Sequence, residues 1–180
     1  MSITASHIIG RNEVSIIRYL VALGFSLAAL IFQHLIHELS HVLAARLCGE
    51  KVIRVQWLTY HGGTRVFYEN EPDPGSEETN KKWMLIAGSG FITTTILGYL
   101  FTVLYFVVAN GLLKAILCYF SVIFLVVDSL YFFIGSIGNF GDVTGVRKMA
   151  RISRRLSILL CIAILAIHLA IIIRCFYLPL

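Results

Sequence analysis

Residues 14–47 read VSIIRYLVALGFSLAALIFQHLIHELSHVLAARL, and this stretch decides the class of fold. It is apolar over most of its length, and as a helix it would be about 50 Å long. The hydrocarbon core of a bilayer is only about 30 Å thick. The stretch is therefore either one long tilted membrane helix or two helices that are broken near Gly24 or Gln33. Gly49 is well placed to end it.

Three further apolar stretches follow, at about residues 82–109, 112–135 and 153–178. Hydrophobic residues make up 58% of the chain and charged residues only 14%, whereas soluble domains average about a quarter charged residues. The sequence therefore predicts a single all-α polytopic membrane domain over residues 1–180, with about four transmembrane helices. Because no signal-peptide pattern begins the chain, we expect the first apolar stretch to remain in the mature protein.

The segments between these stretches are of other kinds. In residues 51–68, β-branched and aromatic side chains flank His61-Gly62-Gly63, which predicts a small β-hairpin. Residues 69–80 are rich in acidic residues and contain two prolines, so we expect a polar surface loop. Four glycines between Gly135 and Gly145 predict a break in helical structure.

Basic residues are distributed unevenly among the loops. Two segments hold most of them: Arg46, Lys51, Arg54, Arg65, Lys81 and Lys82 in the first, and Arg147, Lys148, Arg151, Arg154 and Arg155 in the second. Because cytoplasmic loops carry an excess of Lys and Arg, we expect both segments, and the hairpin with them, in the cytoplasm. With four spans, both termini then face outward. We interpret the net charge of +5 as this topology signal, and we expect no nucleic-acid partner.

The motif His37-Glu38-Leu39-Ser40-His41 lies inside the first apolar stretch. His37 and His41 are four residues apart, so a helix places both imidazoles on one face, where they can bind one metal ion. Glu38 is offset by about 100° from His37 and can activate a metal-coordinated water. Ionisable residues within a membrane are costly and usually functional, which favours a zinc site over a polar cluster between helices.

A catalytic zinc ion needs a third protein ligand, and the sequence offers two candidates. Asp142 follows the glycine-rich break, toward the cytoplasmic end of the third apolar stretch. His37 and His41 lie about 9–15 Å before the cytoplasmic end of their own stretch, which is a similar depth. Asp128 lies about three to four helical turns deeper. Topology therefore favours Asp142, and Asp128 stays open as a ligand or as a residue that supports one.

Two other polar residues are candidates for supporting roles. His34 lies on the same helical face as His37 and His41, where it can support a ligand, line a water path or act as a ligand itself. Asn139 is a candidate hydrogen-bond donor to the oxyanion of a hydrolytic reaction, although a turn-forming role is favoured for it.

Taken in order, these motifs resemble the site-2 protease family of intramembrane zinc metalloproteases. Residues 37–49 resemble the HExGH helix of that family, with its Ala-rich continuation and closing glycine. Ala87-Gly88-Ser89-Gly90 resembles its Ala-Gly-Pro segment, and Gly141-Asp142 resembles the motif that supplies its third zinc ligand.

The chain also departs from the usual family pattern. Ser40 and Ser89 stand where the family often has Gly and Pro, respectively. Asp142 is followed by Val143, where the family often has Leu-Asp-Gly with prolines nearby. The chain resembles more closely a compact branch of the family whose third motif is Gly-Asp.

The resemblance implies a mechanism and a set of partners. Zinc held by His37, His41 and Asp142 would lower the pKa of a coordinated water to about 7, and Glu38 would take its proton and pass it to the leaving amine. The implied partners are the lipid bilayer and a transmembrane protein substrate, and a regulatory membrane partner stays open. The hairpin either pairs with the substrate as an added strand or is purely structural.

Two rival functions use the same residues. A membrane metal transporter or sensor could bind its ion through His37 and His41, but transporters usually show repeated halves, and no internal repeat is evident here. A catalytically inactive scaffold would leave Glu38 without a purpose. We therefore expect an intramembrane zinc endopeptidase whose active site lies toward the cytoplasm.

Overall fold

A computed structural model of the chain describes residues 4–57, 64–69 and 77–177. The helices are α1 (Thr4–Leu47), α2 (Glu77–Val107), α3 (Gly111–Gly138), α4 (Gly141–Met149) and α5 (Arg154–Ile172), and α5 continues into a π-helical turn at Ile173–Tyr177. Strands β1 (Val52–Gln56) and β2 (Arg65–Tyr68) pair antiparallel. The predicted all-α fold with a small hairpin is confirmed, and the proposed turn at His61 lies outside the described residues.

Four helices in the described part of the chain are long and apolar enough to cross a membrane. These segments are Tyr19–Leu47, Asn80–Val107, Gly111–Gly138 and Arg154–Tyr177. Their mean hydropathy is between 1.7 and 3.0. Together they make the chain an integral, multi-pass membrane protein.

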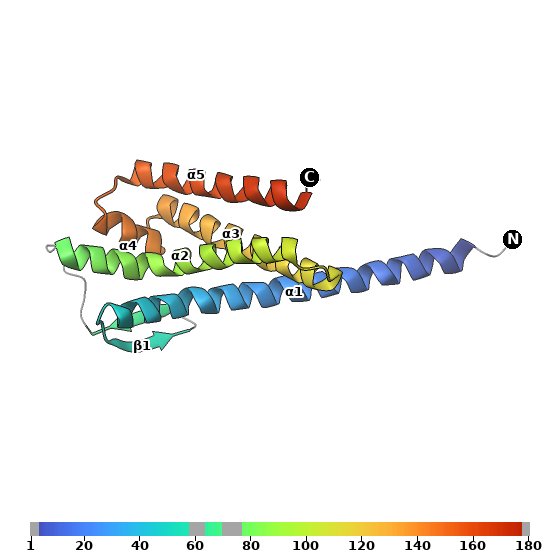
Figure 1. Cartoon of the computed structure of the whole chain (residues 1–180), viewed down its shortest axis with the longest axis horizontal. Coiled ribbons are helices and arrows are strands. Elements are labelled where there is room, and N and C mark those ends of the chain that lie inside the picture. The colour runs from blue at the N-terminus through green and yellow to red at the C-terminus, as the bar shows by residue number, and fades with distance from the viewer. Residues whose placement is uncertain (1–3, 58–63, 70–76, 178–180) are drawn as a thin grey trace.

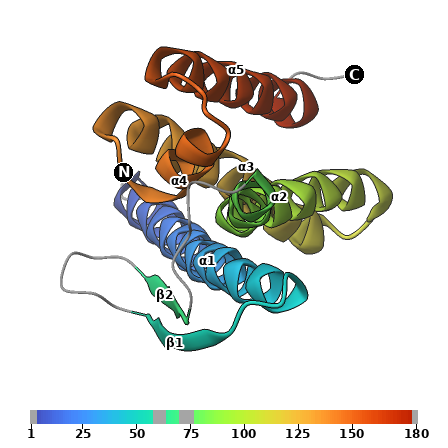
Figure 2. The same ribbon diagram turned by 90° about the vertical axis from the view of Figure 1, so that its left-hand side faces the viewer.

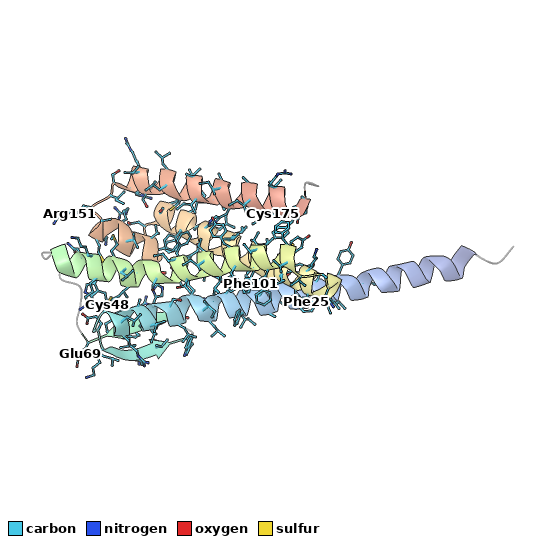
Figure 3. The ribbon with its side chains drawn as sticks, in the orientation of Figure 1. Phe25, Cys48, Glu69, Phe101, Arg151 and Cys175 are labelled. Carbon is cyan, nitrogen blue, oxygen red and sulfur yellow. The ribbon has the colours of Figure 1, made fainter. Side chains whose placement is uncertain are left out.

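The long helices lie side by side, with α2 and α3 in the middle of the bundle (Figure 1). Helix α1 packs on α2 and α3, and α5 packs on α3 at the other side of the bundle, as the view along the helices shows (Figure 2). The hairpin lies beside the C-terminal end of α1. Cys48, Glu69 and Arg151 mark this end of the molecule, and Phe25, Phe101 and Cys175 lie toward the opposite end (Figure 3).

Helix α1 settles the question of one helix or two. It is continuous over 44 residues, and neither Gly24 nor Gln33 interrupts it. Its N-terminal part extends well beyond the bundle (Figure 1). The histidine motif therefore sits in an unbroken helix, near the end that carries the hairpin.

The glycine-rich break is shorter than the sequence predicts. Helix α3 runs through Gly135 to Gly138, and Asn139 then adopts a left-handed conformation, with φ 59°, as its C-cap. Phe140 is extended, and Gly141, with φ 68°, begins the nine-residue helix α4. Left-handed geometry is favourable for glycine and accessible to Asn, so this short turn ends α3 and starts α4. It places Asp142 in the first turn of α4, which packs against α2 and α3.

A small apolar cluster fixes the hairpin in place. Ala45, Trp83 and Ile86 are buried where α1 meets α2, and Val52 and Tyr68 of the two strands pack against them. The rings of Tyr68 and Trp83 meet edge to face, with centroids 4.9 Å apart. The cluster therefore holds β2 next to the helix segments that carry the histidine motif.

Candidate metal centre

Helix α1 brings His37 and His41 together as the spacing predicts. Both side chains are buried, and their ring centroids lie 5.0 Å apart. Helix α1 carries them on the face that packs against α2 and α3.

Asp142 reaches this pair from the first turn of α4. Its Oδ2 atom lies 3.0 Å from His37 Nε2 and 3.3 Å from His41 Nε2. Burial raises the pKa of this carboxyl, but its electrostatic interactions with the two histidines outweigh burial and hold the pKa below its usual value. The positive end of the α4 dipole also favours a carboxylate here.

Two separations among these three side chains suit ligands of one zinc ion. Tetrahedral ligands at about 2.0–2.2 Å from zinc lie roughly 3.3 Å from one another. The separations from Asp142 Oδ2 to the two Nε2 atoms, 3.0 and 3.3 Å, match this value. In addition, His41 Nε2 is buried and makes no hydrogen bond within the described residues. A cation would satisfy this nitrogen, so the side chains fit a zinc ion.

The other ring nitrogen of His41 is held by α2. His41 Nδ1 lies 2.7 Å from the carbonyl oxygen of Ile86, to which it donates, and 3.2 Å from Ser89 Oγ. Ser89 Oγ itself donates to the same carbonyl at 2.7 Å. These contacts leave the lone pair of His41 Nε2 facing Asp142, as a metal ligand requires.

Asp128 contacts His37 from the opposite edge of the ring. Its Oδ2 atom lies 3.0 Å from His37 Nδ1, whereas Asp142 faces Nε2. His37, His41 and Asp142 offer ligand atoms within 4.8 Å of one another, and Asp128 is not part of that group. The arrangement thus favours Asp142 as the third ligand. Asp128 instead contacts the ring nitrogen of His37 that faces away from Asp142.

Gly90 of α2 makes room for His37. A Cβ atom at this position would lie 2.5 Å from His37 Nε2 and 2.6 Å from Cδ2, well inside van der Waals contact. The absence of a side chain at position 90 is therefore a condition for the observed ring position.

Glu38 lines an open cavity next to the two histidines and Asp142. The cavity has a volume of about 290 Å³, and strand β2 forms one wall. Tyr68 of β2 lines it, and burial together with the charges of Asp142 and Glu38 raises the pKa of its hydroxyl, which stays neutral. Glu38 therefore borders open space next to His41 and Asp142.

A second cavity, of about 250 Å³, lies on the other side of His37. It is lined by Gln33, His34, His37, Thr64, Val127, Asp128 and Tyr131. His34 Nε2 donates to Thr64 Oγ1 at 2.9 Å, and Thr64 in turn donates to the Trp57 carbonyl at 3.0 Å. His34 therefore lies beside a polar cavity and links α1 to the hairpin, outside the group of candidate ligands.

Asn139 has a structural place. It caps α3, and its Oδ1 atom accepts a hydrogen bond of 2.7 Å from Arg147. The side chain is exposed. This geometry agrees with the turn-forming role that the sequence favours.

Several residues that shape the centre were not identified from the sequence. Gln33, Ser89 and Thr94 all contact a histidine or Asp128. Gln33 had a usable signal, because it lies four residues before His37 and so shares its helical face. Ser89 lies in the segment that resembles a family motif, but its contact with His41, like that of Thr94 with Asp128, depends on which face of α2 meets α1 and α3.

Comparison with known proteins agrees with these observations. The family model for peptidase family M50 matches residues 25–173, which include the histidine motif, Asp128 and Asp142. No curated protein and no solved structure matches the chain.

Proposed function

The chain belongs to peptidase family M50, the site-2 protease family, and from this membership we propose that it is an intramembrane zinc endopeptidase. Its substrates are transmembrane or membrane-adjacent proteins. One observation carries the proposal: two histidine nitrogens and one carboxylate oxygen converge at ligand separations beside the cavity that Glu38 lines.

His37 and His41 through Nε2, and Asp142 through Oδ2, would hold the zinc ion. Bound there, zinc supplies a Lewis acid that polarises the scissile carbonyl and lowers the pKa of water to about 7. Glu38 accepts the proton of the attacking water and passes it to the leaving amine. Its position in the cavity, one residue from His37, supports this role.

The substrate segment binds in the cavity between β2 and the histidine motif. A peptide bond is accessible to water only where the helix around it has unwound. The extended backbone of β2 offers such a segment an edge for strand pairing. Val66, Phe67 and Tyr68 of this strand line the cavity next to Glu38, which supports substrate binding there.

The Glu38→Gln variant tests the mechanism. It keeps the three ligands but removes the base, so zinc content should stay at one ion per chain while cleavage of a transmembrane substrate falls at least 10²-fold. Zinc is measured by elemental analysis of the purified protein, and cleavage in liposomes that contain a substrate. Cleavage that survives the substitution contradicts the assignment of Glu38.

The ligand set has its own test. The His37→Ala and Asp142→Ala variants should lose zinc, whereas Glu38→Gln should not. Undiminished zinc in Asp142→Ala would remove this residue from the ligand set. Zinc flux across the liposome membrane, without proteolysis by the wild-type protein, would instead favour a metal transporter.

A further inference from the structure

Asp128 is a buried carboxylate that the proposed reaction does not use. It lies within α3, and its residue is only 3% exposed. In the described part of the chain it takes part in hydrogen bonds with three side chains. Gln33 Nε2 donates to Oδ1 at 2.5 Å, Thr94 Oγ1 donates to Oδ2, and His37 Nδ1 lies 3.0 Å from Oδ2.

Burying this carboxylate within the membrane costs free energy, which indicates that Asp128 has a function. A carboxylate inside a membrane loses its hydration, and such groups are rare except at functional sites. Gln33 and Thr94 satisfy part of the hydrogen-bonding capacity of Asp128 from two different helices, α1 and α2. They hold the carboxylate at a fixed position against the edge of His37.

The two ring nitrogens of His37 face two different carboxylates. Nδ1 faces Asp128 and Nε2 faces Asp142, each at 3.0 Å. A carboxylate at Nδ1 holds the ring proton on that nitrogen, which leaves the lone pair of Nε2 free. His41 has the equivalent arrangement, but there the acceptor at Nδ1 is the main-chain carbonyl of Ile86.

We propose that Asp128 is the positioning residue of the metal centre: it orients the His37 ring and selects the ring nitrogen that binds zinc. This inference rests on the proposed function, because it concerns the same zinc site. Acceptors behind a metal-bound histidine raise its basicity, and their removal typically lowers metal affinity about 10- to 100-fold. Asp128 acts in this way through His37 and is not itself a ligand.

The Asp128→Asn variant tests the proposal, because Asn has nearly the same shape but no charge. Zinc affinity is measured by competition with a chromophoric chelator, using the whole purified protein in nanodiscs. We expect about 10- to 100-fold weaker binding. At saturating zinc the variant should still take up one ion, since all three ligands remain.

Ser121→Ala is the matched control for loss of a buried hydrogen bond. Ser121 is also fully buried on α3, and it bonds to Thr102 at 2.5 Å instead of to the metal centre. Both variants should lower the thermal stability of the metal-free protein, but only Asp128→Asn should weaken zinc binding. Equal zinc affinities in Asp128→Asn and the wild type would overturn the proposal.

Combining Asp128→Asn with His37→Ala distinguishes a role of Asp128 in positioning His37 from a general structural role. The His37→Ala variant keeps two ligands, so the weak zinc affinity that remains after it loses its co-purified ion is measured by titration with added zinc. If Asp128 acts through His37, adding Asp128→Asn to this variant should change that affinity by less than about twofold. A merely structural role would weaken both backgrounds to the same extent, and this result would overturn the proposal. Zinc loss as complete as in Asp142→Ala would also overturn it, by making Asp128 a ligand. A wild-type protein that binds no zinc would instead contradict the proposed function.

Discussion

At the scale of single residues, Gly90 shows how a position without a side chain shapes the metal centre. The ring of His37 occupies the space that a Cβ atom would need. On α2, Gly88 is two residues away, and a Cβ there would meet only Val146 and Ile92 at 3.7 Å, an ordinary contact. The two glycines are therefore nearly equal in sequence but very different in surroundings.

We expect Gly90→Ala to displace His37 and weaken zinc binding by about tenfold or more. Changes to residues that orient a metal ligand typically have effects of this size. Gly88→Ala is the control, because both substitutions give the same gain in helix propensity, about 1 kcal/mol. Chelator competition with both purified variants measures the difference. Equal zinc affinities would show that His37 can move without loss.

The sequence predicts some of these residues and not others. His37, Glu38 and His41 follow from helical spacing inside an apolar segment, and Asp142 follows from its depth. Gly90 and Ser89 lie in a segment that resembles a family motif, but their contacts with the histidines depend on how α1 packs against α2. Side-chain contacts between helices are not encoded in the spacing of any one helix.

At the scale of elements, the hairpin and α4 build the walls around the histidine motif. The apolar runs predict the four long helices and the β-formers predict the hairpin, because both signals are local in sequence. Helix α4 was not predicted. It has nine residues and low hydropathy, and it follows directly from a turn of two residues, so no periodic signal marks it. The glycines around it predict only a break.

Strand β2 should contact the substrate if its edge pairs with an unwound segment. A photo-crosslinking amino acid at Val66, which lines the cavity, should capture a transmembrane substrate in the Glu38→Gln background, where cleavage is blocked. The control position is Ile53 of β1, which is 65% exposed. Crosslinked products are detected by a shift in gel mobility. Equal capture at both positions would argue for a purely structural hairpin.

At the scale of the whole molecule, basic residues gather at one end of the bundle. The hairpin and the starts of α2 and α5 lie at this end (Figure 1), and Arg151 is labelled there (Figure 3). Lys51 directly precedes β1, and Arg154 is the first residue of α5. The excess of Lys and Arg predicts that this end faces the cytoplasm. The metal centre lies nearer to it than to the opposite end.

This orientation predicts where the C-terminus lies. A reporter enzyme that is active only outside the cytoplasm should be active when fused after Leu180, and inactive when inserted between Glu69 and Glu77. Activity is assayed in intact cells, with protein amounts compared by immunoblotting. The opposite pattern would place the metal centre toward the outer face and contradict the charge rule for this chain.

The position of His37 and His41 along α1 has a consequence for substrate choice. They lie six to ten residues before the end of this helix at Leu47, or about 9–15 Å along its axis. If the chain cleaves transmembrane proteins as proposed, this distance sets the depth at which the scissile bond of a substrate must lie. Residues with weak helix propensity, such as glycine, ease unwinding at that depth. Under the proposed function, we therefore expect substrate selection to depend on the position and local helix stability of the cleaved segment more than on the identity of any one side chain.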